Sequence, residues 1–164
     1  MSAEAKPSRL PANASRAIYG QILVTSMVGA LSEDSDIDAE YILVSVGATM
    51  LVFWLAHVYA GVLGHHLQLG HGFSWSRVGA IARHEWPILA SGIPPAIVLA
   101  LGTIGLFERE TAFWLAIGAG IASLVFWGVA YAREQGYHTA VVALAGALNG
   151  LLGVVIVALK VLVH

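Results

Sequence analysis

Long apolar stretches, separated by short polar segments, make up most of the chain. Four of them match the length of about 20 residues that a helix needs to cross the hydrocarbon core of a bilayer. They cover residues 41–64, 87–107, 111–132 and 139–159, and His57 is the only Asp, Glu, Lys, Arg or His within them. Helices satisfy their backbone polar groups without water, so these stretches predict four membrane-spanning helices.

A shorter apolar stretch over residues 17–31 allows three interpretations. It contains Gln21, Thr25 and Ser26, basic residues precede it, and positions 28–30 are small residues or valine. It is a fifth span that stays in the protein, a helix lying in the membrane interface, or a signal peptide cleaved near residues 28–30. We expect a retained span, which gives five spans in all. A cleaved or interfacial segment would leave four.

The charged residues between these stretches predict the orientation of the chain. Basic residues fall in alternate segments, and the segment after residue 31 is acidic without a single base. The positive-inside bias then places the N-terminus inside and predicts a multi-pass protein of the plasma (cytoplasmic) membrane. The acidic segment lies outside, where Asp38 is placed to cap the next helix. The basic residues of the segments assigned to the inside are Lys6, Arg9 and Arg16, then Arg77 and Arg83, then Arg133.

The remaining segments divide the chain into a flexible arm and one membrane domain. Residues 1–15, rich in Ala, Ser and Pro, predict the arm, and residues 16–164 form a single transmembrane helical domain. An amphipathic segment over residues 74–86 predicts an interfacial helix before the span that begins at Pro87. Within that span, Ser91, Gly92, Pro94 and Pro95 predict a kink. Such a hinge either builds a binding site, as broken helices do in transporters, or only shapes the packing.

Composition rules out most other classes of protein. Of the 164 residues, 58% are hydrophobic and 11% are charged, with a net charge of −2 and no cysteine. An average soluble domain is about 25% charged. These values exclude a soluble domain, a disordered chain, a disulfide scaffold and a cysteine-ligated metal protein, and no charge pattern points to nucleic acid. The predicted fold class is therefore an all-α, polytopic transmembrane helical bundle.

Polar side chains inside the predicted spans are the candidates for chemistry. His57 shares a helix face with Gly61 and Gly64, which predicts that it faces the bundle rather than lipid. Gln21 is expected at a similar depth, where it would hydrogen-bond to His57 if the two helices pack together. An ionisable group inside a membrane is a functional candidate because hydrocarbon makes it costly. The alternative is a neutral histidine that only joins two helices.

Three further polar residues complete the candidate site. Asn149 lies near the middle of its span, beside a face that carries Gly146 and Gly150. It is either an interhelical hydrogen bond or a pathway residue. His84 and Glu85 are adjacent at the inner start of the span over residues 87–107, an arrangement compatible with proton transfer and equally with an interfacial hydrogen bond. The glycine-rich faces predict close helix contacts, within one chain or between copies in a homo-oligomer.

Histidines on the inner side are weak candidates for a metal site. The side chains of His65, His66 and His71 are of a type that binds zinc, but their spacing matches no specific metal motif. A haem held by paired histidines would need a buried histidine facing His57, and the sequence offers none. It also offers no nucleophile–base pair and no phosphate-binding loop, so we expect no enzymatic activity and no cofactor.

Three short segments carry a resemblance to known proteins: RAIYG at 16–20, FWLAHVYA at 53–60 and HEWP at 84–87. They resemble a group of uncharacterised small polytopic integral membrane proteins of high-GC bacteria. The resemblance extends from residue 16 to the end of the chain. It implies a similar topology with the first span retained, and it implies no activity.

Two functions fit this interpretation of the sequence. The first is a small channel or transporter for protons or cations, with a path lined by polar residues and a hinge at Pro94 and Pro95. The second is a structural or accessory protein of the bilayer, without transport activity, that docks an unidentified membrane partner. A membrane protein that binds metal or haem is a third alternative. The residues expected along the path are His57, Gln21, Asn149, Glu85 and His84.

Overall fold

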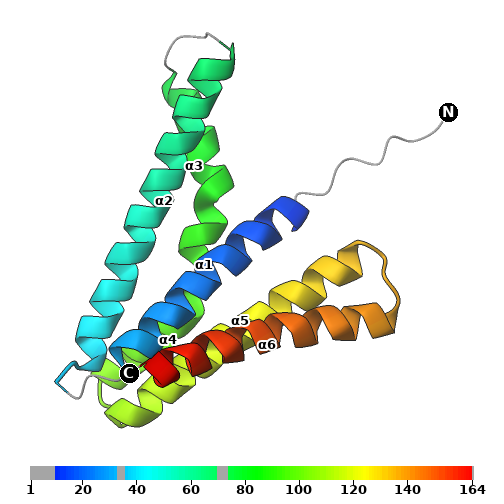
Figure 1. Ribbon diagram of the computed structural model, residues 1–164. Coiled ribbons are helices and arrows are strands. Elements are labelled where there is room, and N and C mark those ends of the chain that lie inside the picture. Colours follow the sequence, from blue (N-terminus) through cyan, green and yellow to red (C-terminus); the bar gives the residue numbers. More distant parts are fainter. Residues whose placement is uncertain (1–9, 33–35, 70–73, 164) are drawn as a thin grey trace.

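Six helices account for the secondary structure in the part of the chain that the computed structural model describes, residues 10–32, 36–69 and 74–163 (Figure 1). No strand occurs within these ranges, so the predicted all-α class is confirmed. The helices are α1 (Leu10–Leu31), α2 (Ala39–Leu69), α3 (Trp75–Ala90), α4 (Ile93–Thr103), α5 (Arg109–Glu134) and α6 (Thr139–Val163).

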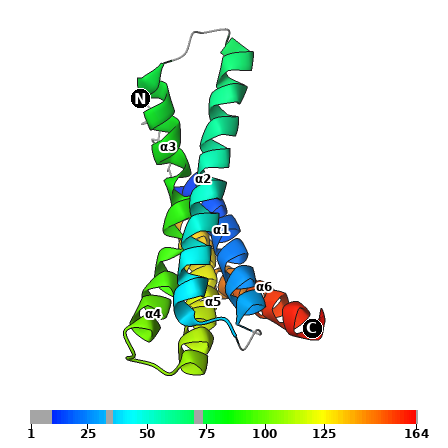
Figure 2. The ribbon, with the colours of Figure 1, turned by 90° about the vertical axis from the view of Figure 1, so that its left-hand side faces the viewer.

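Two helical hairpins diverge from a common base, and α1 lies between them. α2 and α3 run side by side and antiparallel in one arm, and α5 and α6 form the other arm (Figure 1, Figure 2). α4 lies at the base, where it packs against α2 and α5. α1 contacts α2, α3, α5 and α6. α1 therefore contacts both helices of each arm and forms the centre of the fold, while α4 joins the arms at the base.

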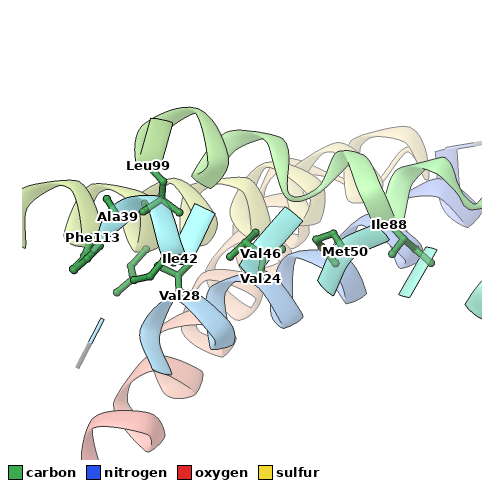
Figure 3. Packing of buried hydrophobic residues seen from close by; sticks show 11 residues of the cluster. Val24, Val28, Ala39, Ile42, Val46, Met50, Ile88, Leu99 and Phe113 are labelled. Carbon is green, nitrogen blue, oxygen red and sulfur yellow. The ribbon is translucent and has the colours of Figure 1, made fainter. Parts of the chain in front are cut away.

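The hydrophobic core extends from the base, where α1, α2, α4 and α5 meet, to Met50 of α2 and Ile88 of α3 (Figure 3). Large apolar side chains also remain exposed on the outer faces, among them Val44, Val52 and Leu63 of α2. A bundle that is apolar on its outside as well as in its core suits a hydrocarbon surrounding. The most buried core residues are Val24, Val28, Ile42, Val46, Met50, Ile88 and Leu99.

Asp38 caps α2, as the sequence predicts. Its Oδ1 accepts a hydrogen bond of 2.8 Å from the backbone N–H of Tyr41. This bond satisfies one of the amide groups that the first turn of a helix leaves unpaired. Arg109 Nε donates to the carbonyl of Ile37 at 2.7 Å, which ties the start of α2 to the start of α5.

Three helices are long and apolar enough to cross a membrane, and the α3–α4 pair makes a fourth if it counts as one bent span. The three segments are Ala39–His66, Arg109–Glu134 and Thr139–Leu159. The chain thus has the helices of a multi-pass membrane protein, although fewer than the five predicted. The predicted span that is missing from this set is α1. It has 22 residues, but Arg16 and Gln21 lower its mean hydropathy.

A break between α3 and α4 provides the kink expected in the span over residues 87–107, but the helix boundary differs from the prediction. α3 continues through Pro87 to Ala90, and α4 begins at Ile93 with its axis bent by 54°. The sequence placed the boundary between an interfacial helix and a span at Pro87. Pro94 and Pro95 lack the N–H groups that would bond to the preceding turn, so the helix stops before them and restarts with both in its first turn.

The predicted flexible arm over residues 1–15 is too long. α1 begins at Leu10, so residues 10–15 belong to a helix, while residues 1–9 lie outside the described part of the chain. Pro11 is tolerated because the first turn of a helix needs no N–H donor there. Ala12 and Ala14 have high helix propensity, which favours extending the helix in this direction.

Candidate functional site

Among the described residues, α1 carries the two most buried polar side chains. Burial recurs every three to four residues from Ala14 to Val28, the pattern of a helix with one broad face packed against its neighbours. Gln21 and Thr25 are 0% and 1% exposed. Buried polar groups are costly unless they are paired, so the partners of these side chains decide what the bundle centre can do.

An ion pair joins α1 to α3. Nε of Arg16 lies 2.8 Å from Oε2 of Glu85, and the two side chains are 23% and 11% exposed. Nδ1 of His84 lies 3.3 Å from the other carboxylate oxygen, Oε1, and the His84 side chain is largely exposed. The structure therefore brings the two predicted residues His84 and Glu85 together with Arg16, which the sequence pattern marks only as an inner-side charge.

His57 contacts Tyr19 of α1 rather than Gln21. The two ring centroids are 5.6 Å apart, with the planes inclined by 56°. Nδ1 of His57 lies 2.9 Å from the carbonyl oxygen of Phe53, so this nitrogen carries the hydrogen and Nε2 is the atom that can accept a proton. The ring is half-buried between α1 and α2. The predicted hydrogen bond between Gln21 and His57 is wrong, because Tyr19 presents its ring to α2 while Gln21 points toward α5.

Gln21 and Thr25 form a buried polar pair that faces α5. Gln21 Nε2 lies 3.5 Å from Thr25 Oγ1, at the long limit for a hydrogen bond. Among the described residues, Gln21 Oε1 is the one buried side-chain nitrogen or oxygen without a partner. If the amide oxygen and nitrogen were exchanged, the nitrogen would be the atom without a partner. Gly120 of α5 lies directly opposite, since a Cβ at that position would overlap Thr25 Oγ1.

The polar face of α1 continues toward the base of the fold. Gly29 and Ser32 follow Gln21 and Thr25 at helical spacing on the same side of α1. Both residues line a cavity of about 260 Å³ that α5 and α6 complete. We call the set of Gln21, Thr25, Gly29 and Ser32, with the side of α5 that covers it, the polar seam.

Arg109 stands at the mouth of this cavity, which we call the Arg109 cavity. Its guanidinium group lies 4.7 Å from the centroid of the Phe113 ring, and its Nε is held by the carbonyl of Ile37. Arg109 also lines a second cavity of about 220 Å³, together with Asp38 and Glu40. The open end of the polar seam is therefore charged, while its inner end at Gln21 is closed by the bundle.

Asn149 belongs to the contact between α5 and α6 and lies outside the polar seam. Its Nδ2 donates to the carbonyl of Ala145 on its own helix at 2.9 Å, and a Cβ on Gly128 of α5 would lie 2.6 Å from this nitrogen. Gly146 and Gly150 also pack closely against valine side chains of α5. The glycine-rich face of α6 is thus used within the chain, and the predicted homo-oligomer would need another surface.

The three histidines predicted as weak metal candidates do not meet in the described part of the chain. His65 and His66 are exposed near the end of α2, and His71 lies outside the described residues. Within the described ranges, no three His, Cys, Asp or Glu side chains are grouped closely enough to hold a metal ion. A metal site at these positions stays a prediction.

Sequence reasoning missed Arg16, Tyr19 and Gly120 as parts of the site. One signal was available for Arg16, because Glu85 is the only carboxylate in residues 65–86 and charges in a membrane protein tend to pair. Tyr19 and Gly120 gave no comparable signal. Their roles depend on which helix lies opposite, and the spacing of residues along one helix does not contain that information.

No protein-family model, curated protein or solved structure matches the chain. The resemblance to small integral membrane proteins of high-GC bacteria stays a prediction. Functional inference therefore depends on the arrangement of polar residues around α1.

Proposed function

We propose that α1 is a fifth transmembrane helix, in a bundle whose N-terminus lies inside the cell. Its 22 residues extend about 33 Å, enough for a hydrocarbon core about 30 Å thick. Gln21 and Thr25 are covered by α5, and Arg16 is paired with Glu85. A helix of modest hydropathy can cross a membrane when neighbouring helices cover its polar groups, so the low hydropathy of α1 does not oppose this assignment.

We further propose that the protein is not an enzyme and that it moves protons or small cations along the polar seam. The observation that carries this proposal is the buried, unpartnered amide oxygen of Gln21, on the face of α1 whose Gly29 and Ser32 line the Arg109 cavity. A buried polar group without a partner costs free energy in a membrane bundle unless it binds water or an ion. Thr25 and Ser32 supply the next polar groups toward the open end.

The other end of the path would lie among the groups that α1 holds against α2 and α3. Glu85 and His84 can exchange protons with each other, and Nε2 of His57 is a further acceptor. The break between α3 and α4 is close to this end, because Ser91 packs directly against Gly20 of α1. In this proposal, movement at the break connects Gln21 to these groups. Asn149 has no part in the path.

A structural or accessory role is the second candidate, and one observation favours it. His57 and Asn149 both bond to a carbonyl one turn earlier in their own helix, which satisfies a polar group without any pathway. Under this alternative, the polar seam only holds α1 against α5. The two candidates differ in a measurable way, since only the first predicts flux.

Flux measurements in liposomes test the first candidate. Purified protein is reconstituted with a pH-sensitive dye inside, and proton entry is followed under an imposed membrane potential for the wild type, Gln21→Met and Ser26→Ala. We expect Gln21→Met to lower the rate by about tenfold or more, because a lost contact of about 1.4 kcal/mol changes a rate tenfold. Ser26→Ala is the matched control, since Ser26 lies on α1 but outside the polar seam.

Two outcomes would reject transport through the polar seam. If the wild type moves neither protons nor Na⁺ or K⁺ faster than protein-free liposomes, the accessory role is favoured. If Gln21→Met and Ser26→Ala both keep the wild-type rate, a flux exists but does not pass Gln21. Equal helicity of all three proteins by circular dichroism is required for either conclusion.

A further inference from the structure

The Arg109 cavity combines charges of both signs with an apolar wall. Arg109 and Glu110 are adjacent at its mouth, and Ser32 adds a hydroxyl group. Phe113 and Ile117, both buried, form the wall one and two turns further along α5. Trp114 also lines the cavity and is 59% exposed, as aromatic residues at a membrane–water interface are. The cavity therefore offers a polar entrance beside an apolar interior.

We propose that this cavity binds the headgroup of a zwitterionic amine phospholipid, with the phosphate at Arg109 and the ammonium at Glu110. Guanidinium groups bind phosphate through charge-assisted hydrogen bonds, and a carboxylate accepts hydrogen bonds from a primary ammonium. The apolar wall takes the glycerol and the first part of an acyl chain. The proposal does not depend on transport, because its readout is binding; a headgroup bound here would occupy the open end of the polar seam, so the two proposals are tested separately.

The size of the cavity suits this ligand. A water molecule occupies about 30 Å³ in the liquid. The cavity volume of about 260 Å³ is several times this value, so the cavity has room for a small polar headgroup such as phosphoethanolamine. A whole lipid does not fit, so the acyl chains would lie along the exposed apolar surface beside Trp114.

Charge distinguishes an amine lipid from an anionic one. Among the described residues that line the two cavities, Asp38, Glu40 and Glu110 are acidic and only Arg109 is basic. An anionic headgroup would face this excess of carboxylates, whereas a zwitterion places its ammonium there. A choline headgroup has the same charge but no N–H donor for Glu110. Phosphatidylethanolamine should therefore bind better than phosphatidylcholine or phosphatidylglycerol.

Lipid binding is measured by native mass spectrometry of the detergent-solubilised full chain with each of the three lipids. We expect phosphatidylethanolamine to bind the wild type at least about tenfold more tightly than the other two, as a charge-assisted hydrogen bond allows. Glu110→Gln should remove this preference. Glu108→Gln should keep it, because Glu108 is also exposed and neighbours Arg109 but does not line the cavity.

A second pair of variants fills the cavity without disturbing the charges. An ideal Cβ at Gly29 or at Gly47 has no described atom within 4 Å, and only Gly29 lines the cavity. Gly29→Leu should therefore keep the fold and lose the bound lipid, while Gly47→Leu keeps both. Thermal unfolding of the two variants verifies that both are folded.

Three results would overturn the proposal. The first is equal binding of phosphatidylethanolamine and phosphatidylcholine by the wild type. The second is unchanged binding by a folded Gly29→Leu variant. The third is binding of soluble phosphoethanolamine with none of the lipid, which would assign the cavity to a free zwitterion instead of a membrane lipid.

Discussion

Single glycines decide where the helices of this bundle approach one another. A Cβ on Gly20 would overlap the Ser91 hydroxyl and lie 2.7 Å from the carbonyl oxygen of Ile88, which belongs to the backbone of α3. Gly120 and Gly128 leave room for Thr25 and Asn149 in the same way. Small residues at such crossings allow close packing, which is the main source of helix association in a membrane.

Gly20→Ala is predicted to destabilise the fold. The added methyl group meets backbone atoms that cannot rotate away, and we expect a loss of about 1–3 kcal/mol. The measurement is equilibrium unfolding in detergent, followed by circular dichroism. Gly47→Ala is the matched control, since it lies in α2 with no described atom near its Cβ, and it should be neutral or stabilising by up to about 1 kcal/mol. Equal stability of the two variants would contradict the close contact between α1 and α3.

The candidate site was predictable in part at this scale. Polar groups are costly in hydrocarbon, and this cost identified Gln21, His57 and Glu85 from the sequence. In the structure these three residues have their partners on α1, which are Thr25, Tyr19 and Arg16, respectively. The pairing of those residues was not predictable. His57 and Gln21 were expected to bond, but Tyr19 lies against His57, because residues two apart on α1 point to different neighbouring helices.

The helices themselves show how far apolar length predicts an element. It placed α2, α5 and α6, because long uncharged stretches have few other structures available in a membrane. It misplaces the end of α3, because Pro87 in the sequence favours the start of a new helix. Pro87 is accommodated inside α3, and the consecutive Pro94 and Pro95 set the break instead.

The ion pair between Arg16 and Glu85 is predicted to hold α1 against α3. A double-mutant cycle with Arg16→Met and Glu85→Gln should give a coupling energy of about 1–3 kcal/mol, since both side chains are largely covered. The cycle is measured by the same unfolding experiment in detergent. The pair Arg16→Met and His84→Gln is the control and should show a coupling below about 0.5 kcal/mol, because His84 is mostly exposed. Similar couplings in both cycles would contradict a specific contact between the two helices.

At the scale of the whole molecule, the position of α1 distinguishes the structure from a simple row of spans. The ends of α1, α4 and the starts of α2 and α5 gather at the base, where the two cavities beside Arg109 also lie. The two arms extend away from this base with α1 between them (Figure 1). α1 has the lowest mean hydropathy of the five proposed spans, yet it contacts both arms. The polar residues that lower its hydropathy are those that its neighbouring helices cover.

The most direct measurement is the sidedness of the two ends of α1. The sequence contains no cysteine, so single substitutions Ser15→Cys, Asp36→Cys and His65→Cys give unambiguous sites for a membrane-impermeant thiol reagent in sealed vesicles. All three positions are exposed. If α1 crosses the membrane, Ser15→Cys and His65→Cys are labelled from one side and Asp36→Cys from the other. Labelling of Ser15→Cys and Asp36→Cys from the same side, with His65→Cys opposite, would contradict a fifth span and the transport path proposed along it.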